Sequence, residues 1–147
     1  MNINNYIEIA KNKINNKYLK TLVLGIFSGI LLSFAAVAST VASSMITNYS
    51  ISKLLAALIF PMGLILIILL KTELFTGNSL MVIPLLEKKI TIKELLRNWL
   101  LVYLGNLLGS IIMALLISNT TVGDTIKITF TNITNNKIVI TIPVVFI

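Results

Sequence analysis

The stretch KTELFTGN, residues 71–78, places a lysine, a glutamate, two threonines, a glycine and an asparagine inside an otherwise apolar region. The seventeen residues before it (54–70) carry no charge, and the apolar run SLMVIPLL (79–86) follows it. A straight helix over residues 54–86 would measure about 50 Å, whereas the hydrocarbon core of a bilayer is about 30 Å thick. The sequence therefore predicts that this region breaks, tilts strongly or leaves the membrane.

The composition of the 147-residue chain is that of a membrane protein. It is 56% hydrophobic and 12% charged, whereas soluble domains are about 45–50% apolar and about 25% charged. The absence of cysteine and histidine excludes disulfides and thiolate metal sites and removes the commonest general base, so we expect no metal and no cofactor. The net charge is +7, but the basic residues lie at the edges of apolar runs. They indicate membrane topology and not nucleic-acid binding.

Three segments are predicted to cross the lipid bilayer, so the expected fold is an all-α membrane protein. They are residues 21–46, residues 52–86 with a break at 71–78, and residues 95–118. Each is long and apolar enough to span about 30 Å of hydrocarbon. Trp99 and Tyr103, near the start of the third span, suit the aromatic belt at a membrane surface.

Glycine pairs four residues apart occur in the first and third spans. They are Gly25 with Gly29, and Gly105 with Gly109. Small residues let helix backbones approach closely in lipid, although glycine is common in membrane helices in any case. The pairs predict that the first and third spans have close-packing faces.

Residues 1–20 are predicted to form an amphipathic helix in the plane of the membrane surface. A frayed tail is the alternative, since asparagine-rich segments are poor helix formers. The lysines of residues 1–20 and of the connector 87–97 are separated by two crossings and so lie on one side. The positive-inside rule makes that side cytoplasmic, which predicts a multi-pass protein of the inner (plasma) membrane with a cytoplasmic N-terminus.

Residues 119–147 are then an extracytoplasmic tail. TIKITFTNIT (125–134) alternates like a strand, and Asn135 and Asn136 suit a turn before the apolar run 138–147. This pattern predicts an irregular or β-like tail. The chain stops inside an apolar run too short for a helical span, so we expect a truncated or frameshifted product.

Periodicity leaves two interpretations of residues 71–78 open. In one, the second helix simply ends at Leu70, and Lys71 and Glu73 are ordinary cytoplasmic charges. In the other, the helix is interrupted inside the membrane, where non-helical backbone is tolerated only against protein or a wet cavity.

The second interpretation gives the break a chemical role. A half-helix that starts inside the membrane offers free N–H groups to an anion. Gly77 and Asn78 would supply unusual backbone angles, and Thr76 would offer a hydroxyl. Leu74 and Phe75 would form a dry gate.

Two motifs resemble those of the formate/nitrite transporter family. Glu73–Asn78 (ELFTGN) resembles its ELFT signature, and Arg97–Asn106 (RNWLLVYLGN) is similar to the segment that opens its third helix. Phe60–Gly63 (FPMG) also fits its second helix. The resemblance covers roughly residues 5–118.

This resemblance implies a fold and a transport function. The fold would be an aquaporin-like protomer of six helices in an inverted repeat, assembled as a homo-pentamer in the lipid bilayer with one pore per subunit. The present chain would be the first half-repeat, with three transmembrane segments. The function would be passage of small monovalent weak-acid anions such as formate, nitrite or hydrosulfide, and not an enzymatic activity.

The resemblance also implies roles for individual residues. Leu74 would belong to the hydrophobic constriction, with Phe75 beside it, and Thr76 would help to bind the anion or to position a central histidine. Lys71 would be a vestibule charge in place of the small or apolar residue usual in relatives. The loop that interrupts the helix would contain Glu73, Gly77 and Asn78. The motif on the third span would contain Asn98, Trp99, Tyr103, Gly105 and Asn106.

The chain departs from this family in two respects: it holds no histidine and no second repeat. We therefore expect a half-transporter, truncated, frameshifted or split, that conducts anions only when a second half completes the pore. The alternative is a non-transporting membrane remnant, or a subunit that associates with intact pentamers.

Overall fold

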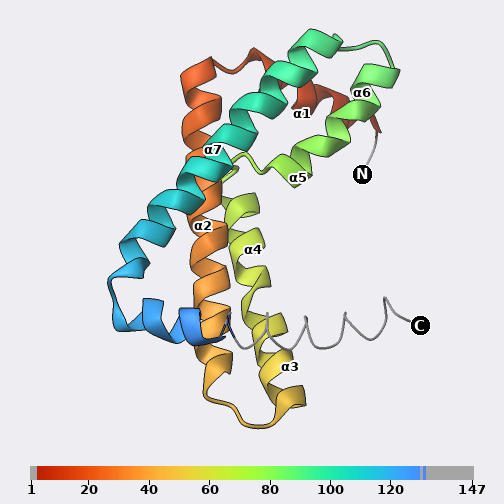
Figure 1. The fold of residues 1–147 in the computed structure, drawn as a ribbon. Coiled ribbons are helices and arrows are strands. Elements are labelled where there is room, and N and C mark those ends of the chain that lie inside the picture. Colours follow the sequence, from red (N-terminus) through yellow and green to blue (C-terminus); the bar gives the residue numbers. More distant parts are fainter. Residues whose placement is uncertain (1–2, 130, 132–147) are drawn as a thin grey trace, which may run out of the picture.

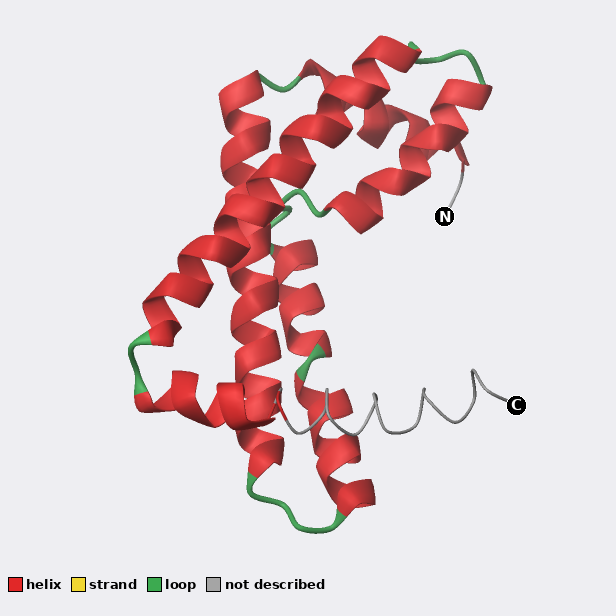
Figure 2. Ribbon diagram, viewed as in Figure 1, coloured by secondary structure: helices red, strands yellow, loops and turns green. Residues whose placement is uncertain are grey.

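The computed structural model describes residues 3–129 and residue 131, and these residues form helices joined by short loops, with no strand among them (Figures 1 and 2). Among these described residues, three helices are long and apolar enough to cross a membrane, and the second is kinked where Phe60 meets Pro61. The chain is therefore an integral membrane protein. In chain order the elements are α1 (Ile3–Asn15), α2 (Tyr18–Ser44), α3 (Tyr49–Ile59), α4 (Pro61–Leu69), α5 (Phe75–Asn78), the 3-10 helix η1 (Ser79–Met81), α6 (Val82–Leu86) and α7 (Ile92–Ser118).

The predicted spans and the observed helices differ mainly at their ends. The first prediction, 21–46, falls on α2, and the third, 95–118, falls on α7, which begins earlier, at Ile92. Thr91 starts α7 with a capping box, because its hydroxyl accepts the Glu94 N–H while the Glu94 carboxylate accepts the Thr91 N–H. The second prediction, 52–86, comprises α3, α4, a non-helical stretch at 70–74, and the short helices of 75–86.

Helices α2 and α7 cross at the two glycine pairs (Figure 1). A Cβ atom added to Gly105 would lie 2.9 Å from the Cα of Gly25, and one added to Gly109 would overlap the carbonyl oxygen of Ile26. Gly29 faces the backbone of Asn106 in the same way. The close packing predicted from the glycine spacing is confirmed, and it brings the two backbones into direct contact.

Helix α1 packs against the start of α7 and the end of α6. Its buried side chains Ala10 and Ile14 form an apolar cluster with Met81 of η1, Ile90 of the α6–α7 connection and Leu95 of α7. Arg97 of α7 donates a hydrogen bond of 2.5 Å to the Ile14 carbonyl, which satisfies an acceptor in the last turn of α1. A frayed tail is therefore the wrong description of residues 3–15.

The two lysine-rich segments lie at the same end of the molecule. Lys11 of α1 and Lys89 of the α6–α7 connection line one small polar pocket, together with Glu94. Lys127, by contrast, lies in the segment that follows α7, at the opposite end of that helix. The structure thus brings the two segments together at one end of the bundle, and that this end faces one side of a membrane stays a prediction.

The prediction of a β-like tail is wrong for residues 125–129, because residues 121–129 are helical. The hydroxyl groups of Thr125 and Thr129 donate to the carbonyl oxygens four residues earlier, at 3.1 and 2.9 Å. Such hydroxyl bonds let threonine fit a helix despite its β-branched side chain. The predicted turn at Asn135 and Asn136 and the apolar run 138–147 lie outside the described residues.

Candidate functional site

The second span is interrupted directly after α4. Two backbone bonds close the end of this helix: Lys71 N–H donates to the Ile68 carbonyl at 3.2 Å, and Thr72 N–H donates to the Ile67 carbonyl at 3.1 Å. This pattern requires a left-handed residue between the helix and the loop, and Lys71 occupies that position with φ 51°. Glycine is the usual residue there because L side chains are strained at positive φ.

The expectation that Gly77 and Asn78 supply unusual backbone angles is therefore wrong. Both lie in α5, and none of the described glycines has a positive φ. The non-helical stretch is residues 70–74, shorter than the predicted 71–78, because the helix resumes at Phe75. Gly77 instead leaves open space, since an added Cβ would meet no atom within 4 Å.

Asn106 of α7 anchors the interrupted backbone. Its amide nitrogen donates to the carbonyl oxygens of Gly25 and Glu73, both at 2.9 Å, and its amide oxygen accepts the Phe75 N–H at 2.9 Å. Glu73 N–H donates to the Leu24 carbonyl of α2 at 3.3 Å. Backbone groups that leave a helix in lipid need such partners. The loop is thus built into the packing of α2 and α7.

Ser28 of α2 is fully buried, and its hydroxyl has no hydrogen-bond partner among the described residues. A helical serine ordinarily donates to the carbonyl three or four residues earlier, as Ser43 does. At Ser28 these are the carbonyls of Gly25 and Leu24, and both already accept a bond from Asn106 or the loop. Anchoring of the loop therefore accounts for the unpartnered hydroxyl.

Next to the loop lies a buried cluster of one ion pair and two asparagines. Lys13 Nζ of α1 lies 2.8 Å from Glu73 Oε2 and 2.6 Å from Asn78 Oδ1. The Asn78 amide nitrogen donates to Glu73 at 2.8 Å and to Asn98 of α7 at 2.9 Å. Trp99 donates its indole N–H to the Asn78 carbonyl at 2.9 Å. Every charge in the cluster is paired, as burial requires.

Helix α4 does end with Leu70 as its C-cap, and Lys71 is exposed, as the first interpretation expected. Its other part, in which Glu73 is an ordinary cytoplasmic charge, is wrong because Glu73 is buried. The sequence predictions also missed Lys13. The available signal was Glu73 itself: an acid inside a membrane region requires a cationic partner. Several lysines precede it in the chain, so the sequence does not say which one it is.

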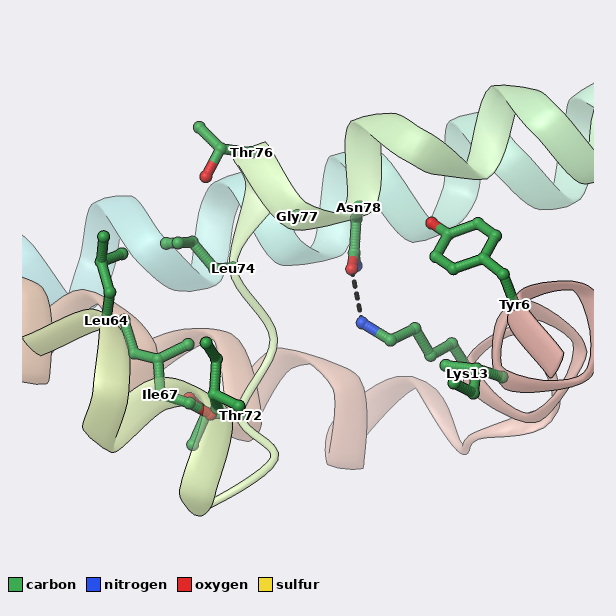
Figure 3. A pocket seen from close by; sticks show the side chains of 11 residues that line it. Tyr6, Lys13, Leu64, Ile67, Thr72, Leu74, Thr76, Gly77 and Asn78 are labelled. Carbon is green, nitrogen blue, oxygen red and sulfur yellow. Dashed lines mark hydrogen bonds between the residues drawn. The ribbon is translucent and has the colours of Figure 1, made fainter. Parts of the chain in front are cut away.

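A cavity of about 450 Å³ lies beside this cluster (Figure 3). One wall comes from the residues that follow the break, Leu74, Thr76, Gly77 and Asn78. The other walls come from α1, through Tyr6, Ile9 and Lys13, and from α4 and the loop, through Leu64, Ile67, Ile68 and Thr72. The lining is mostly apolar, with a few polar groups placed in it, as is common for small-ligand sites.

Phe75 does not share this cavity with Leu74 and Thr76. Its ring packs edge-on against Trp99 and Tyr103 of α7, with centroid separations of 5.9 and 5.7 Å. Lys71 is exposed and does not line the cavity either. The structure therefore brings together Leu74, Thr76 and Gly77, and it places Phe75 and Lys71 elsewhere.

The motif residues of α7 contact the loop and the short helix α5 and hold them in place. Asn98 and Trp99 hold Asn78, Asn106 holds the interrupted backbone, and Tyr103 packs on Phe75. Gly105 lies at the crossing with α2. Within residues 3–129 and 131, no group of three or more acidic, histidine or cysteine residues is arranged to hold a metal ion.

The interrupted span thus carries the ELFT segment, and the helix with the RNW…GN motif, α7, holds it in place. The family model for the formate/nitrite transporter matches residues 1–147, and the chain belongs to this family. The resemblance expected from the two motifs is thus confirmed.

Among relatives, the chain is similar to the formate channel FocA of Haemophilus influenzae, with 33% identity over 110 residues, which covers 74% of this chain and 39% of that protein. The formate channel FocA of Escherichia coli strain K12 is 37% identical over 102 residues, 67% of this chain and 35% of that protein. The uncharacterized transporter YrhG of Bacillus subtilis is 37% identical over 114 residues, which covers 74% of this chain and 42% of that protein. The alignments thus span well under half the length of these relatives.

Proposed function

We propose that this chain builds one half of a channel for small monovalent weak-acid anions, namely formate, nitrite or hydrosulfide. The observation that carries the proposal is the 450 Å³ cavity at the interrupted span, where an ammonium group, a hydroxyl group and an apolar wall meet. Two relatives are named as formate channels, which supports this substrate class. The proposed activity is passage through a pore and not catalysis.

Different residues of the cavity would attract the anion and control its passage. Lys13 favours an anion in the cavity, and its charge is balanced by Glu73, so an anion is drawn in without being held tightly. Leu64, Ile67 and Leu74 line the same cavity and offer no hydrogen bonds. A charged group is costly to move past such a surface, whereas the neutral protonated acid is not. Thr76 supplies a hydroxyl whose hydrogen bond replaces one that the solute makes to its hydration water.

We further propose that three more spans, supplied by the rest of a longer chain or by a separate chain, complete the wall of the pore, and that five such units assemble. The open apolar surfaces of α2 and α7 suit this, since Phe27, Leu100 and Leu116 are all more than half exposed. The lysine-rich end, with α1, would face the cytoplasm of a cell with this protein in its inner membrane. Lys71 would be a charge at the vestibule.

Flux into liposomes tests the channel. The chain is reconstituted alone and with the second half of a family member, and formate, nitrite and hydrosulfide entry is followed by stopped-flow light scattering. We expect flux from the completed assembly and none from the isolated half. Thr76→Val should lower the flux about tenfold, since one hydrogen bond is worth about 1 kcal/mol or somewhat more. Thr121→Val, the same change at an exposed position outside the cavity, is the matched control.

Absence of flux from a correctly assembled complex would contradict the proposal and favour a non-transporting subunit. Orientation has its own test, because the chain has no cysteine of its own. Single cysteines at Lys11 and at Lys127 are labelled from outside intact cells with an impermeant maleimide. The proposal expects labelling at position 127 only.

A further inference from the structure

Tyr6 of α1 lines the same cavity as Leu74 and Thr76, although it precedes them by about seventy residues in the chain. It lies seven residues before Lys13, so the two side chains share a face of α1. Figure 3 shows the phenol hydroxyl and the Lys13 ammonium both directed towards Asn78. Helix α1 thus contributes two polar side chains to the cavity and is more than a surface anchor.

Both groups have donor capacity left for a ligand. An ammonium group has three N–H donors, and Lys13 uses two of them, on Glu73 and Asn78. The Tyr6 hydroxyl has no hydrogen-bond partner among the described residues, and Tyr6 is partly buried. Burial, and secondarily the negative charge of Glu73, raise the pKa of Tyr6. The phenol is therefore a neutral donor at physiological pH.

We propose that Tyr6 and Lys13 form a binding subsite for a two-oxygen oxyanion, of the formate or nitrite type, on the α1 side of the cavity. This inference rests on the proposed channel function and narrows its substrate class. Oxyanion oxygens accept short, strong hydrogen bonds from hydroxyl and ammonium donors. Sulfur is a weak acceptor, so the same pair of donors gives hydrosulfide little advantage. The Tyr6 hydroxyl is thus a specificity-determining group.

The chain contains its own reporter for this subsite. Trp99 is the only tryptophan, and its indole N–H bonds the carbonyl of Asn78, whose side chain bonds Lys13. An anion that forms a hydrogen bond with the Lys13 ammonium should therefore change the fluorescence emission of Trp99. The purified chain in detergent micelles is titrated with sodium formate, with sodium chloride replaced in step so that ionic strength stays constant.

We expect a saturable change for the wild-type chain with formate. Tyr6→Phe removes only the hydroxyl and should raise the dissociation constant about 5- to 10-fold, which corresponds to one hydrogen bond. Tyr49→Phe is the matched control, because Tyr49 starts α3 at the far end of the bundle and is 74% exposed. Equal formate affinity in Tyr6→Phe and wild type would overturn the subsite, and so would an equal loss in both tyrosine variants.

The same variants in the liposome assay separate this inference from the proposed function. Formate binding that depends on Tyr6, without flux from the completed assembly, would support the subsite and contradict the channel. Flux that is unchanged in Tyr6→Phe, together with unchanged binding, would support the channel and contradict the subsite. A formate-to-hydrosulfide flux ratio that falls in Tyr6→Phe would support the assignment of specificity to the hydroxyl.

Discussion

Lys13 and Glu73 are 60 residues apart in the chain, and their charged groups lie 2.8 Å apart beside the interrupted span. This contact joins the surface helix α1 to the loop that interrupts the membrane span. The Glu73 side chain is 4% exposed and the Lys13 side chain 27%, so the two partners are not equivalent. The carboxylate depends on the pair more than the ammonium group does.

Removal of either partner should destabilise the chain to a different degree. Lys13→Gln leaves a buried carboxylate without its cation and should cost about 3–5 kcal/mol, whereas Glu73→Gln costs less because water reaches Lys13. The double variant should lose less unfolding free energy than the sum of the losses in the two single variants. Unfolding in mixed detergent micelles with increasing dodecyl sulfate measures these free energies. Strictly additive losses would contradict the coupling, and Lys127→Gln, in an exposed pair with Asp124, should have almost no effect.

Loss of the Asn106 side chain should release the loop. Asn106→Ala removes two donors and one acceptor, and each buried group left without a partner costs about 1–3 kcal/mol. Amide hydrogen exchange at Glu73 and Phe75 should then become faster. Ser110→Ala lies one turn further along α7 and breaks only the bond to the Asn106 carbonyl, so it serves as control. Unchanged exchange in Asn106→Ala would show that the loop is held by other contacts.

The two kinds of glycine should respond in opposite ways to alanine. Gly109→Ala forces the added carbon against the Ile26 carbonyl of α2 and should cost about 1–3 kcal/mol as the helices move apart. Gly77→Ala meets open space in a helix and should be neutral or stabilise by up to about 1 kcal/mol. Thermal unfolding in detergent distinguishes them. A similar loss at both positions would argue against the close crossing of α2 and α7.

Lys71 should tolerate glycine better than alanine. Both changes remove the charge, but only glycine relieves the left-handed conformation, which costs an L residue about 1–2 kcal/mol. Lys71→Gly should therefore unfold at a higher temperature than Lys71→Ala. If Lys71 is a vestibule charge, both variants should show the same reduced flux despite their different stabilities. Flux at the wild-type level in both variants would show that Lys71 has no role in anion passage.

Alkaline pH should loosen α1 through Tyr6. The raised pKa of Tyr6 means that the folded state favours the neutral phenol, so this contribution is complete below pH about 10 and is lost as the pH rises through the folded pKa. Melting temperatures measured from pH 8 to pH 11.5 should fall less steeply for Tyr6→Phe than for the wild type. Tyr49→Phe should follow the wild-type curve, because it keeps the Tyr6 phenol.

The sequence was sufficient for features that depend on local pattern. Apolar length identified the spans, and glycine spacing identified the faces of α2 and α7 that meet. The ELFTGN and RNWLLVYLGN motifs identified the family. These features are encoded in consecutive residues, and lipid imposes simple rules on length and spacing.

Features that depend on distant partners were not predictable in the same way. The choice of Lys13 for Glu73, and the direction of Phe75 towards Trp99, follow from how α1 and α7 pack. The left-handed residue was expected at Gly77 because glycine adopts positive φ most easily, but the bonds that close α4 place it at Lys71. The strand expected from 125 onward failed at residues 125–129 because threonine hydroxyls bond their own helix.

The interrupted loop is anchored through main-chain atoms: the N–H and carbonyl of Glu73 and the N–H of Phe75. Any residue other than proline provides those atoms. The side chains of Leu74 and Thr76 line the cavity and take no part in this main-chain anchoring. Evolution, or an engineer, can therefore exchange these two side chains to suit a different solute while the backbone that presents them stays in place.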